Sequence, residues 1–372
     1  MIHVLHILWA AHIGGIERLV LDLATAQSKN PKIHVDIFFG KRVGDFLLKF
    51  QESGFKCHSA YLKSGFDLSP WKYFGTLRVF QNYDILHFHN FNPLLFVSAE
   101  LSGKRIVYTE HGNFGFGRRK TWRDSTKNFF LKRFLNYCVD YISFNSQFTK
   151  QIAENRYGLK SVPRAVIYNG IAFKNVAQSM NITEDHIIEK IRNKFIIGTI
   201  ARFVGYKRID RLIEAFTDFQ EDKNTILLLV GDGILRGELE RLTKELKISD
   251  KTIFTGFRLN VQEFVKLMDV CVFPSENEPF GLVAIEALSL GKPAIVFKDG
   301  GGFVEVVSGF SQENVVEDIS DLVQRLEYYY KNRDEIIEYS QNRIFYAMKF
   351  DISNMADQFS NIYETLVGGD KN

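Results

Sequence analysis

Two cations in the second half of the chain have the spacing needed to hold a phosphate group. Arg202 and Lys207, separated by four residues, stand in the segment ARFVGYKRIDRLIEAF, where an apolar run gives way to a helical pattern. A planar guanidinium and a compact ammonium can hold a diphosphate from two sides. The alternative is a solvated charge pair. Because cations are unfavourable near a helix N-terminus, we expect an anion beside them.

Two carboxylates occupy the segment SENEPFGLVAIEALSLGKP, which predicts a helix from about Phe280. Glu278 and Glu286 are eight residues apart, just over two turns, so the helix would place both near one face. Unpaired N–H groups of the first helical turn, from Phe280, Gly281 and Leu282, could bind a phosphate, while the carboxylates accept sugar hydroxyl protons. A capping Glu and an exposed Glu are the alternative, but Glu286 lies among apolar residues and needs a partner.

Glycine-containing turns supply weaker signals. Gly14 and Gly15 follow the first apolar run and would let a ligand approach the backbone at a helix N-terminus. Gly231 and Asp232, in the segment VGDG, could form the floor of a nucleotide site, and Phe257 could line a base pocket. A tight turn without a ligand, or a turn capped by an Asp, explains the same residues equally simply.

Histidines raise the questions of acid–base chemistry and of metal binding. His111, in the glycine-rich segment YTEHGNFGFG, could hydrogen-bond a substrate or act as a base, although a lone histidine is more often structural. His87 and His89 share one predicted strand. With no Asp, Glu or Cys at ligand spacing beside them, the sequence predicts no metal site.

Strand-like and helix-like segments alternate along the chain and would position these residues in loops that follow strands. Strands are predicted at 2–9, 33–39, 57–62, 84–89, 105–108, 141–144, 164–168, 195–201, 225–230, 252–254, 270–273 and 294–297. This alternation indicates an α/β protein with parallel sheets. We expect two doubly wound domains, 1–175 and 176–350, facing a central cleft. A helix within 351–372 is expected to pack back toward the first domain. Ligands of such sheets bind outside the carboxyl ends of the strands.

Length and composition exclude several classes of protein. The chain has 372 residues, 45% of them hydrophobic and 24% charged, which suits two globular domains. Its apolar runs are far shorter than the roughly 20 residues of a membrane-spanning helix, and its N-terminus lacks a basic lead. The three cysteines are far apart and odd in number, as expected for reduced thiols in a cytoplasmic protein.

Positive charge is concentrated in one segment. Residues 104–133 carry nine basic and two acidic side chains, a net charge of +7. Between Arg118 and Phe134 the basic residues are interleaved with aromatic ones, a pattern typical of a helix docking on an anionic membrane. An ordinary core helix with a solvated basic face is the alternative. No nucleic-acid recognition motif is present, so we expect no nucleic-acid partner.

Taken together, the motifs resemble those of the retaining GT-B glycosyltransferases of family 4. The shared segments are GGIE at 14–17, EHG at 110–112, YNGI at 168–171, ARFVGYKRID, VGDG, FTGF, ENEPFGLVAIEA, and GGFVE at 301–305. They cover nearly the whole chain in order. The resemblance implies two Rossmann-like domains and the transfer of a hexosyl group from a nucleotide-diphosphate sugar, with UDP-sugars favoured. The acceptor would be a saccharide or lipid-linked molecule in polysaccharide, lipopolysaccharide or other glycoconjugate biosynthesis, with neither cofactor nor metal.

The resemblance also implies roles for single residues. Arg202 and Lys207 would hold the donor diphosphate, Glu278 the hydroxyls of the transferred sugar, and Glu286 the ribose. Backbone amides from 280 to 282 would contact sugar and phosphate, Gly15 would face the phosphates, and Phe257 would lie by the base. His111 would approach the reaction centre, which reverses the structural reading of a lone histidine.

Two departures from the family pattern concern local loops. Ala172 stands where an acidic residue often follows the NGI segment, and the stretch after Glu305 is shorter than usual. No carboxylate stands out as a covalent nucleophile, so same-face attack is the expected mechanism. A nucleotide-sugar epimerase of the same fold and a non-catalytic sugar-nucleotide binding protein are the alternatives. We expect a cytoplasmic protein, with the inner face of the membrane as a peripheral site.

Overall fold

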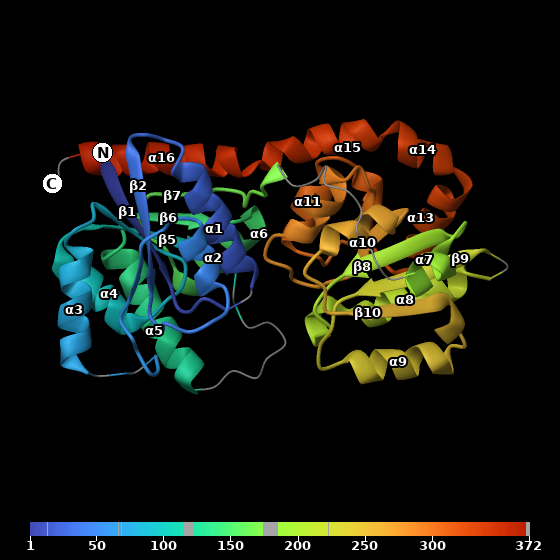
Figure 1. The fold of residues 1–372 in the computed structure, drawn as a ribbon, viewed down its shortest axis with the longest axis horizontal. Coiled ribbons are helices and arrows are strands. Elements are labelled where there is room, and N and C mark those ends of the chain that lie inside the picture. The colour runs from blue at the N-terminus through green and yellow to red at the C-terminus, as the bar shows by residue number, and fades with distance from the viewer. Residues whose placement is uncertain are drawn as a thin grey trace. The chain divides into compact units, whose positions relative to one another are not determined.

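Short apolar runs form the strands of two separate parallel sheets (Figure 1). The computed structural model describes residues 1–12, 14–65, 67, 69–112, 114, 122–173, 185–221 and 223–369. The chain divides into two units. Unit 1 comprises Met1–Ala172 and Phe350–Asn372, and unit 2 comprises Phe173–Lys349.

Unit 1 is built on a seven-stranded sheet in the order β3-β2-β1-β4-β5-β6-β7, with every neighbouring pair parallel. The strands are β1 (Ile2–Leu8), β2 (Ile33–Phe39), β3 (Cys57–Ser59), β4 (Ile85–Phe88), β5 (Arg105–Glu110), β6 (Tyr141–Phe144) and β7 (Arg164–Val166). The strand order reverses between β1 and β4, which makes that point of the carboxyl edge a natural ligand site.

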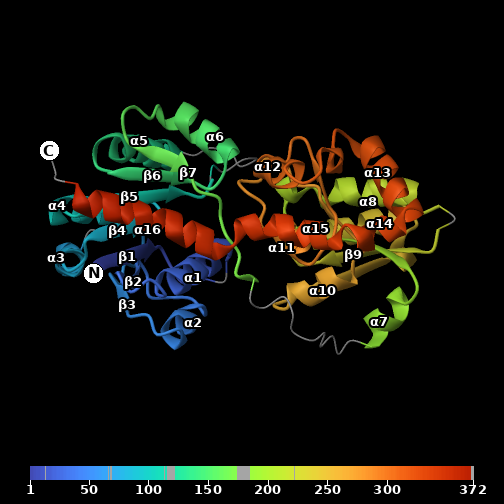
Figure 2. The same cartoon turned by 90° about the horizontal axis from the view of Figure 1, so that it is seen from above.

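Helices cover both faces of this sheet (Figure 2). One face carries α1 (Gly15–Gln27), α2 (Leu47–Glu52) and α16 (Ile352–Gly368). The other carries α3 (Pro70–Phe80), α4 (Pro93–Ser102), α5 (Trp122–Tyr137) and α6 (Gln147–Tyr157). The terminal helix α16 packs against α1 of the same unit.

Unit 2 repeats the architecture with six strands in the order β10-β9-β8-β11-β12-β13. They are β8 (Phe195–Ile200), β9 (Thr225–Val230), β10 (Thr252–Gly256), β11 (Val270–Phe273), β12 (Ala294–Phe297) and β13 (Val315–Val316). The helices are α7 (Asp185–Ile191), α8 (Ile209–Phe219), α9 (Arg236–Glu245), α10 (Val261–Leu267), α11 (Leu282–Ser289), α12 (Gly302–Ser308), α13 (Ile319–Lys331), α14 (Arg333–Glu338) and α15 (Ser340–Ala347). Here the order reverses between β8 and β11.

The predicted α/β fold with two Rossmann-like sheets is confirmed. Strands at 33–39, 141–144, 225–230, 270–273 and 294–297 have the predicted ends, because continuous apolar runs bounded by polar residues define buried parallel strands. Residues 174–184, which include the predicted domain boundary, lie outside the described residues. Among the helices that the structure describes, none has both the length and the apolar character needed to cross a membrane.

Candidate functional site

Lys207 and Glu278 meet at the carboxyl edge of the unit 2 sheet. Lys207 ends a short 3-10 helix, Gly205–Lys207, after β8, and Glu278 lies in the loop after β11. Nζ of Lys207 lies 2.6 Å from Oε2 of Glu278, and their side chains are 12% and 17% exposed. Because β8 and β11 are neighbours at the strand-order reversal, the pair lies where ligands of this fold bind.

Backbone contacts fix the loop that carries Glu278. The carbonyl of Glu278 accepts a hydrogen bond from the N–H of Gly302 at 2.7 Å, and the N–H of Asn277 donates to the carbonyl of Asp299 at 2.8 Å. Gly281 has a φ of 110°, and a Cβ there would lie 2.2 Å from the ring of Phe303. The loop after β11 therefore packs so closely against α12, which carries Phe303, that residue 281 must be glycine.

The predicted helical relation between Glu278 and Glu286 is wrong. α11 begins at Leu282, with Gly281 as its N-cap in the left-handed conformation, so Glu278 and Phe280 precede the helix. A spacing of two turns therefore does not relate the two carboxylates. Glu286 lies half-buried on α11 itself, and Phe280 is buried. The error arose because nothing in the sequence distinguished a left-handed glycine from the first residue of the helix.

Arg202 differs from Lys207 in its surroundings. Its side chain is exposed and makes no hydrogen bond or ion pair with any residue in the part of the chain that the structure describes. Lys207 is paired and also lies 5.9 Å from the centre of the Phe303 ring. Arg202 thus offers an exposed guanidinium on the loop after β8, and Lys207, on the same loop, offers a partly buried ammonium that Glu278 neutralises.

The turn at Gly231 and Asp232 has a structural explanation of its own. Gly231 has a φ of 133°, and a Cβ there would lie 1.9 Å from the carbonyl oxygen of Ala201. Asp232 accepts from the N–H of Gly233 at 2.7 Å and pairs with Arg236 at 3.0 Å. The Gly233 hydrogen bond, assisted by Arg236, lowers the pKa of Asp232. The carboxylate of Asp232 therefore stabilises the turn in which it lies.

Phe257 follows the adjacent strand β10 and is 63% exposed. Its ring is therefore accessible at the carboxyl edge of the unit 2 sheet. This placement leaves its role beside a base as a prediction.

Charged residues that sequence reasoning missed hold these loops together. Arg208, in the left-handed conformation with a φ of 46°, pairs with Asp210 at 2.9 Å and with Glu276 at 3.5 Å. Arg211 forms two hydrogen bonds to Asp299, at 3.0 and 2.8 Å. The cation-rich segment KRIDR was the available signal, but two of its partners, Glu276 and Asp299, lie 68 and 88 residues away in sequence.

In unit 1, the predicted glycines lie at the start of α1. Gly14 is the N-cap, and a Cβ there would lie 2.5 Å from Oε2 of Glu17, in the first turn of the helix. Burial raises the pKa of Glu17. At Gly15, no described atom lies within 4 Å of the position that a Cβ would take. The helix start is therefore open at Gly15, the residue expected to face phosphate.

His111 follows β5 and is 8% exposed. Its Nε2 lies 3.1 Å from Nδ1 of His89. Burial lowers the pKa of His111 to about 4, so the imidazole is neutral near pH 7. The preceding residue, Glu110, accepts a hydrogen bond from the N–H of Gly112 at 2.9 Å, which fixes the turn of the EHG segment.

His6, His87 and His89 form a buried cluster whose ligand atoms lie within 4.8 Å of one another. The sequence did not predict it, because His6 joins the other two only through the pairing of β1 with β4. Every ring nitrogen of the three has a hydrogen-bond partner. The partners are Gln27 and His89 for His6, Tyr363 and Thr109 for His87, and His6 and His111 for His89. The cluster is therefore satisfied as neutral imidazoles.

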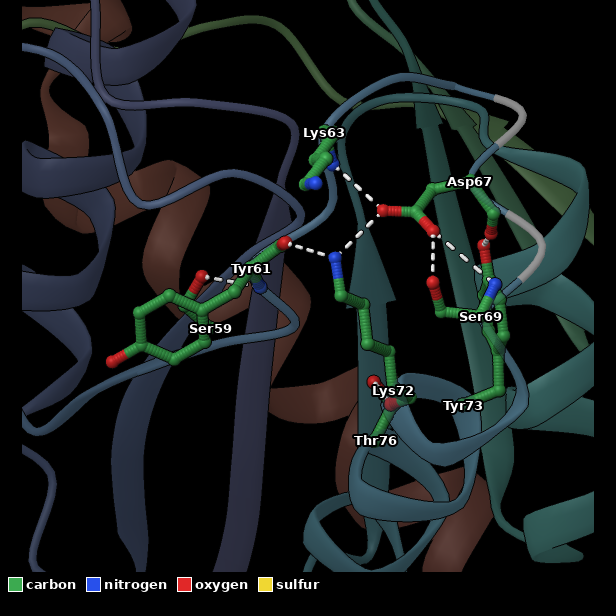
Figure 3. Close-up of polar contacts among 8 residues, drawn as sticks. All are labelled: Ser59, Tyr61, Lys63, Asp67, Ser69, Lys72, Tyr73 and Thr76. Atoms are coloured by element: carbon green, nitrogen blue, oxygen red, sulfur yellow. Dashed lines mark hydrogen bonds and ion pairs between the residues drawn. The ribbon is translucent and has the colours of Figure 1, made fainter.

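A further polar group that the sequence analysis missed lies in the loop between β3 and α3 (Figure 3). Asp67 is 8% exposed and accepts from the N–H of Lys63 at 2.9 Å, from Oγ of Ser69 at 2.6 Å and from Nζ of Lys72 at 2.7 Å. These bonds hold the pKa of Asp67 well below its usual range. The signal was the segment Asp-Leu-Ser-Pro before a helix, and its role is to fix the loop.

Two family models match the chain and together cover most of it. Glycosyltransferase Family 4 matches residues 13–174, and Glycosyl transferases group 1 matches residues 181–343. The O-antigen biosynthesis glycosyltransferase WclY of Escherichia coli is 29% identical over 226 residues, 58% of this chain and 59% of that protein. The chain thus aligns with about three-fifths of the length of this relative.

Two further similarities concern a relative and a solved structure. The UDP-Gal:alpha-D-GlcNAc-diphosphoundecaprenol alpha-1,3-galactosyltransferase of Escherichia coli is 27% identical over 234 residues, 59% of each chain. The crystal structure of Anabaena HepE in complex with UDP and glucose has a TM-score of 0.80 at 19% identity, covering 98% of this chain and 100% of HepE. That likeness establishes the shared fold. The chain belongs to the group 1 glycosyltransferases and has their GT-B fold.

Proposed function

We propose that the protein is a retaining glycosyltransferase that moves a hexosyl group from a UDP-sugar to a saccharide or lipid-linked acceptor in surface polysaccharide biosynthesis. Family membership supports the reaction class. One relative is named for O-antigen biosynthesis, and another for a UDP-galactose donor with a diphosphoundecaprenol acceptor. HepE, of the same fold, was crystallised with UDP and glucose. These names supply the substrate classes for the proposal.

The observation that carries the proposal is the Lys207–Glu278 ion pair at the strand-order reversal. In the ligand-free chain the charges of Lys207 and Glu278 neutralise each other. Both groups can therefore remain half-buried without an uncompensated charge. A bound donor would take over both partners, with Lys207 and the exposed Arg202 on the diphosphate and Glu278 on sugar hydroxyls. Cations held in place where charge develops on a leaving group are often the largest catalytic contribution.

The reaction breaks the bond between the anomeric carbon and the diphosphate oxygen. The acceptor hydroxyl oxygen forms its bond to that carbon on the face the diphosphate leaves, and its proton passes to the departing phosphate oxygen. Lys207 and Arg202 neutralise the charge on the leaving group, so the proposal assigns no step to a metal. His111, as a neutral imidazole, hydrogen-bonds the sugar near the reacting carbon.

The ion pair gives the first experiment, a transfer assay with Lys207→Ala and Glu278→Ala. Donors are first chosen by thermal-shift screening of UDP-, GDP- and ADP-sugars, because ligand binding to the folded state raises Tm. We expect each variant to lose about 10²–10³-fold in kcat. Lys223→Ala is the matched control, since Lys223 pairs with Glu327 at 2.8 Å in the same unit, outside the predicted site. Near-normal turnover by both site variants would overturn the assignment.

The product separates the remaining alternatives. NMR of the product linkage should give the anomeric configuration of the donor, and an inverted product would contradict the retaining mechanism. Incubation with donor alone should leave its sugar configuration unchanged. A new epimer would instead support the epimerase, and binding without turnover under any acceptor would support a sugar-nucleotide binding protein.

The acceptor proposal includes docking on an anionic membrane through unit 1. Helices α3, α4 and α5 pack on one hydrophobic cluster and so share one face of the sheet (Figure 1). Their outer surfaces carry exposed large apolar side chains, namely Trp71, Phe74, Leu101, Phe129, Phe130 and Tyr137. The helices α3 and α5 also carry exposed cations, at Arg78, Lys132 and Arg133. Residues 115–121 of the predicted basic segment lie outside the described part of the chain.

Liposome flotation tests this docking. The protein should float with vesicles containing anionic lipid and not with neutral ones, because apolar insertion and charge attraction act together. The double variant Phe129→Ser/Phe130→Ser should lose flotation, while Ile337→Ser, which changes an exposed apolar residue of unit 2, should retain it. Equal flotation of both variants would refute the assignment of this surface.

A further inference from the structure

A line of four buried side chains crosses the core of unit 1 and ends at His111. Nε2 of His111 lies 3.1 Å from Nδ1 of His89, and Nε2 of His89 lies 2.9 Å from Nδ1 of His6. Nε2 of His6 lies 2.8 Å from Oε1 of Gln27, at the end of α1. The line joins β1, the residues after β4 and β5, and α1, so only the folded unit assembles it.

Each contact in this line is a hydrogen bond, so one of its two atoms must carry a hydrogen and the other must accept it. A neutral imidazole has one N–H donor and one lone pair, and the partner of one nitrogen decides which tautomer forms. Burial lowers the pKa of His6 and His111 to about 4 and that of His89 well below its ordinary value, so all three are neutral near pH 7. Once the direction of one hydrogen bond is fixed, the direction of every bond in the line is fixed.

Gln27 sets that direction. Its carbonyl oxygen faces His6 and can only accept, so Nε2 of His6 carries the hydrogen. Its amide nitrogen donates to Oη of Tyr363 at 3.4 Å, and the Tyr363 hydroxyl can then donate to Nδ1 of His87 at 2.6 Å. Nε2–H of His87 donates to Oγ1 of Thr109 at 2.7 Å. The four histidines concerned thus take the Nε2–H form, which is the more stable tautomer of neutral histidine in water. They are His6, His87, His89 and His111.

We propose that Gln27, acting through His6 and His89, holds His111 in the Nε2–H tautomer, so that His111 presents the lone pair of Nδ1. Nδ1 makes no hydrogen bond to any residue within the described ranges. A neutral nitrogen lone pair accepts a hydrogen bond from a hydroxyl group and does not attract an anion. If the proposed function holds, on which this consequence rests, the group that His111 binds is a sugar hydroxyl, and Gln27, His6 and His89 are positioning residues.

NMR of protein labelled with ¹⁵N-histidine tests the tautomer directly. Protonated and unprotonated ring nitrogens have well separated ¹⁵N shifts, and the His111 signals are assigned by their loss in His111→Asn. We expect the Nε2 of His111 at the protonated shift and Nδ1 at the unprotonated one near pH 7. The reverse pattern in the unmodified protein would overturn the proposal.

Variants of Gln27 test the cause. Gln27→Met removes the accepting oxygen at similar size, and we expect a share of His111 to move to the Nδ1–H form. Gln27→Leu also removes the accepting oxygen without adding a charge and should shift the tautomer in the same direction. Ser360→Ala, which removes a buried hydroxyl of α16 that, among the described residues, bonds to its own helix, should change nothing. An unchanged tautomer in either folded variant of Gln27 would refute the role of Gln27, so Gln27→Leu decides if Gln27→Met fails to fold.

Kinetics separate positioning from a general structural effect. In Gln27→Met, kcat should fall in proportion to the lost Nε2–H fraction, with the KM for the donor unchanged. An unchanged kcat despite a shifted tautomer would overturn the functional consequence. Absence of transfer by the unmodified protein would refute the proposed function, and the NMR result would still decide the tautomer.

Discussion

Single residues in unit 2 shape the candidate site by allowing side chains and loops to approach one another closely. Glu278, the partner of Lys207, lies in the loop after β11, and Gly281 allows that loop to pack against Phe303 of α12. Neither the pairing partner nor the left-handed glycine can be deduced from sequence spacing, because 71 residues separate the two members of the pair. The candidate site in unit 2 therefore combines an ion pair with a loop position that only glycine can occupy.

Gly281→Ala tests this dependence. The new Cβ would lie 2.2 Å from the Phe303 ring at a positive φ, so we expect the free energy of unfolding of unit 2 to fall by about 1–3 kcal/mol. Gly237→Ala is the control, since a Cβ on that residue of α9 meets no described atom within 4 Å. It should raise stability by about 0.5–1 kcal/mol. Urea unfolding measures both changes, and equal effects would contradict the steric account.

At the scale of elements, the strands and the loops that follow them were predictable, and the pairings between them were not. Apolar runs located the strands, and the rule for parallel sheets located functional loops at their carboxyl edges. The start of α11 was misplaced because Gly281 ends the preceding loop in a conformation that sequence does not encode. The buried cluster of His6, His87 and His89 was missed because His6 and His87 become neighbours only through strand register.

The last helix, α16, belongs to the core of unit 1. Its Phe359 is fully buried, and the Phe359 ring centre lies 4.8 Å from that of His87. We expect Phe359→Ala to lower the free energy of unfolding of unit 1 by about 3–5 kcal/mol, since it leaves a cavity beside the histidines. Phe345→Ala, which truncates an exposed ring on α15, should change stability by less than about 0.5 kcal/mol. Comparable losses in denaturant titrations would show that α16 is not a core element.

At the scale of the whole molecule, the two units use one arrangement for different chemistry. In each, candidate residues lie in loops at the carboxyl edge of a parallel sheet whose strand order reverses once. Unit 2 provides charged groups suited to a diphosphate and hydroxyls. Unit 1 provides a neutral imidazole supported by a buried polar line. This division predicts that acid affects the two units differently.

Unit 1 should lose stability as the pH falls from about 6.5 to about 4. Its buried histidines stay neutral in the folded state, with the pKa of His6 and His111 lowered to about 4 by burial, whereas the unfolded chain takes up protons below about 6.5. The unfolded state then binds more protons than the folded state. The free energy of unfolding therefore decreases as the pH decreases, by up to about 1.4 kcal/mol per pH unit for each extra proton. Among the described residues, no carboxylate is hydrogen-bonded to these two imidazoles. Burial raises the pKa of Glu17 and Asp22 in the same unit, so protonation of these two groups in the folded state offsets part of the loss.

Unit 2 should respond more weakly, because burial raises the pKa of Asp269 whereas hydrogen bonds lower that of Asp232, and the two shifts change its stability in opposite directions as the pH falls. The three tryptophans, Trp9, Trp71 and Trp122, all lie in unit 1, so their fluorescence reports that unit selectively. Urea titrations at pH 7 and pH 5 should show the fluorescence midpoint falling while a later transition in far-UV circular dichroism does not. A fluorescence midpoint independent of pH across this range would mean that the histidines are protonated or exposed in the folded chain, and the neutral line ending at His111 could not exist.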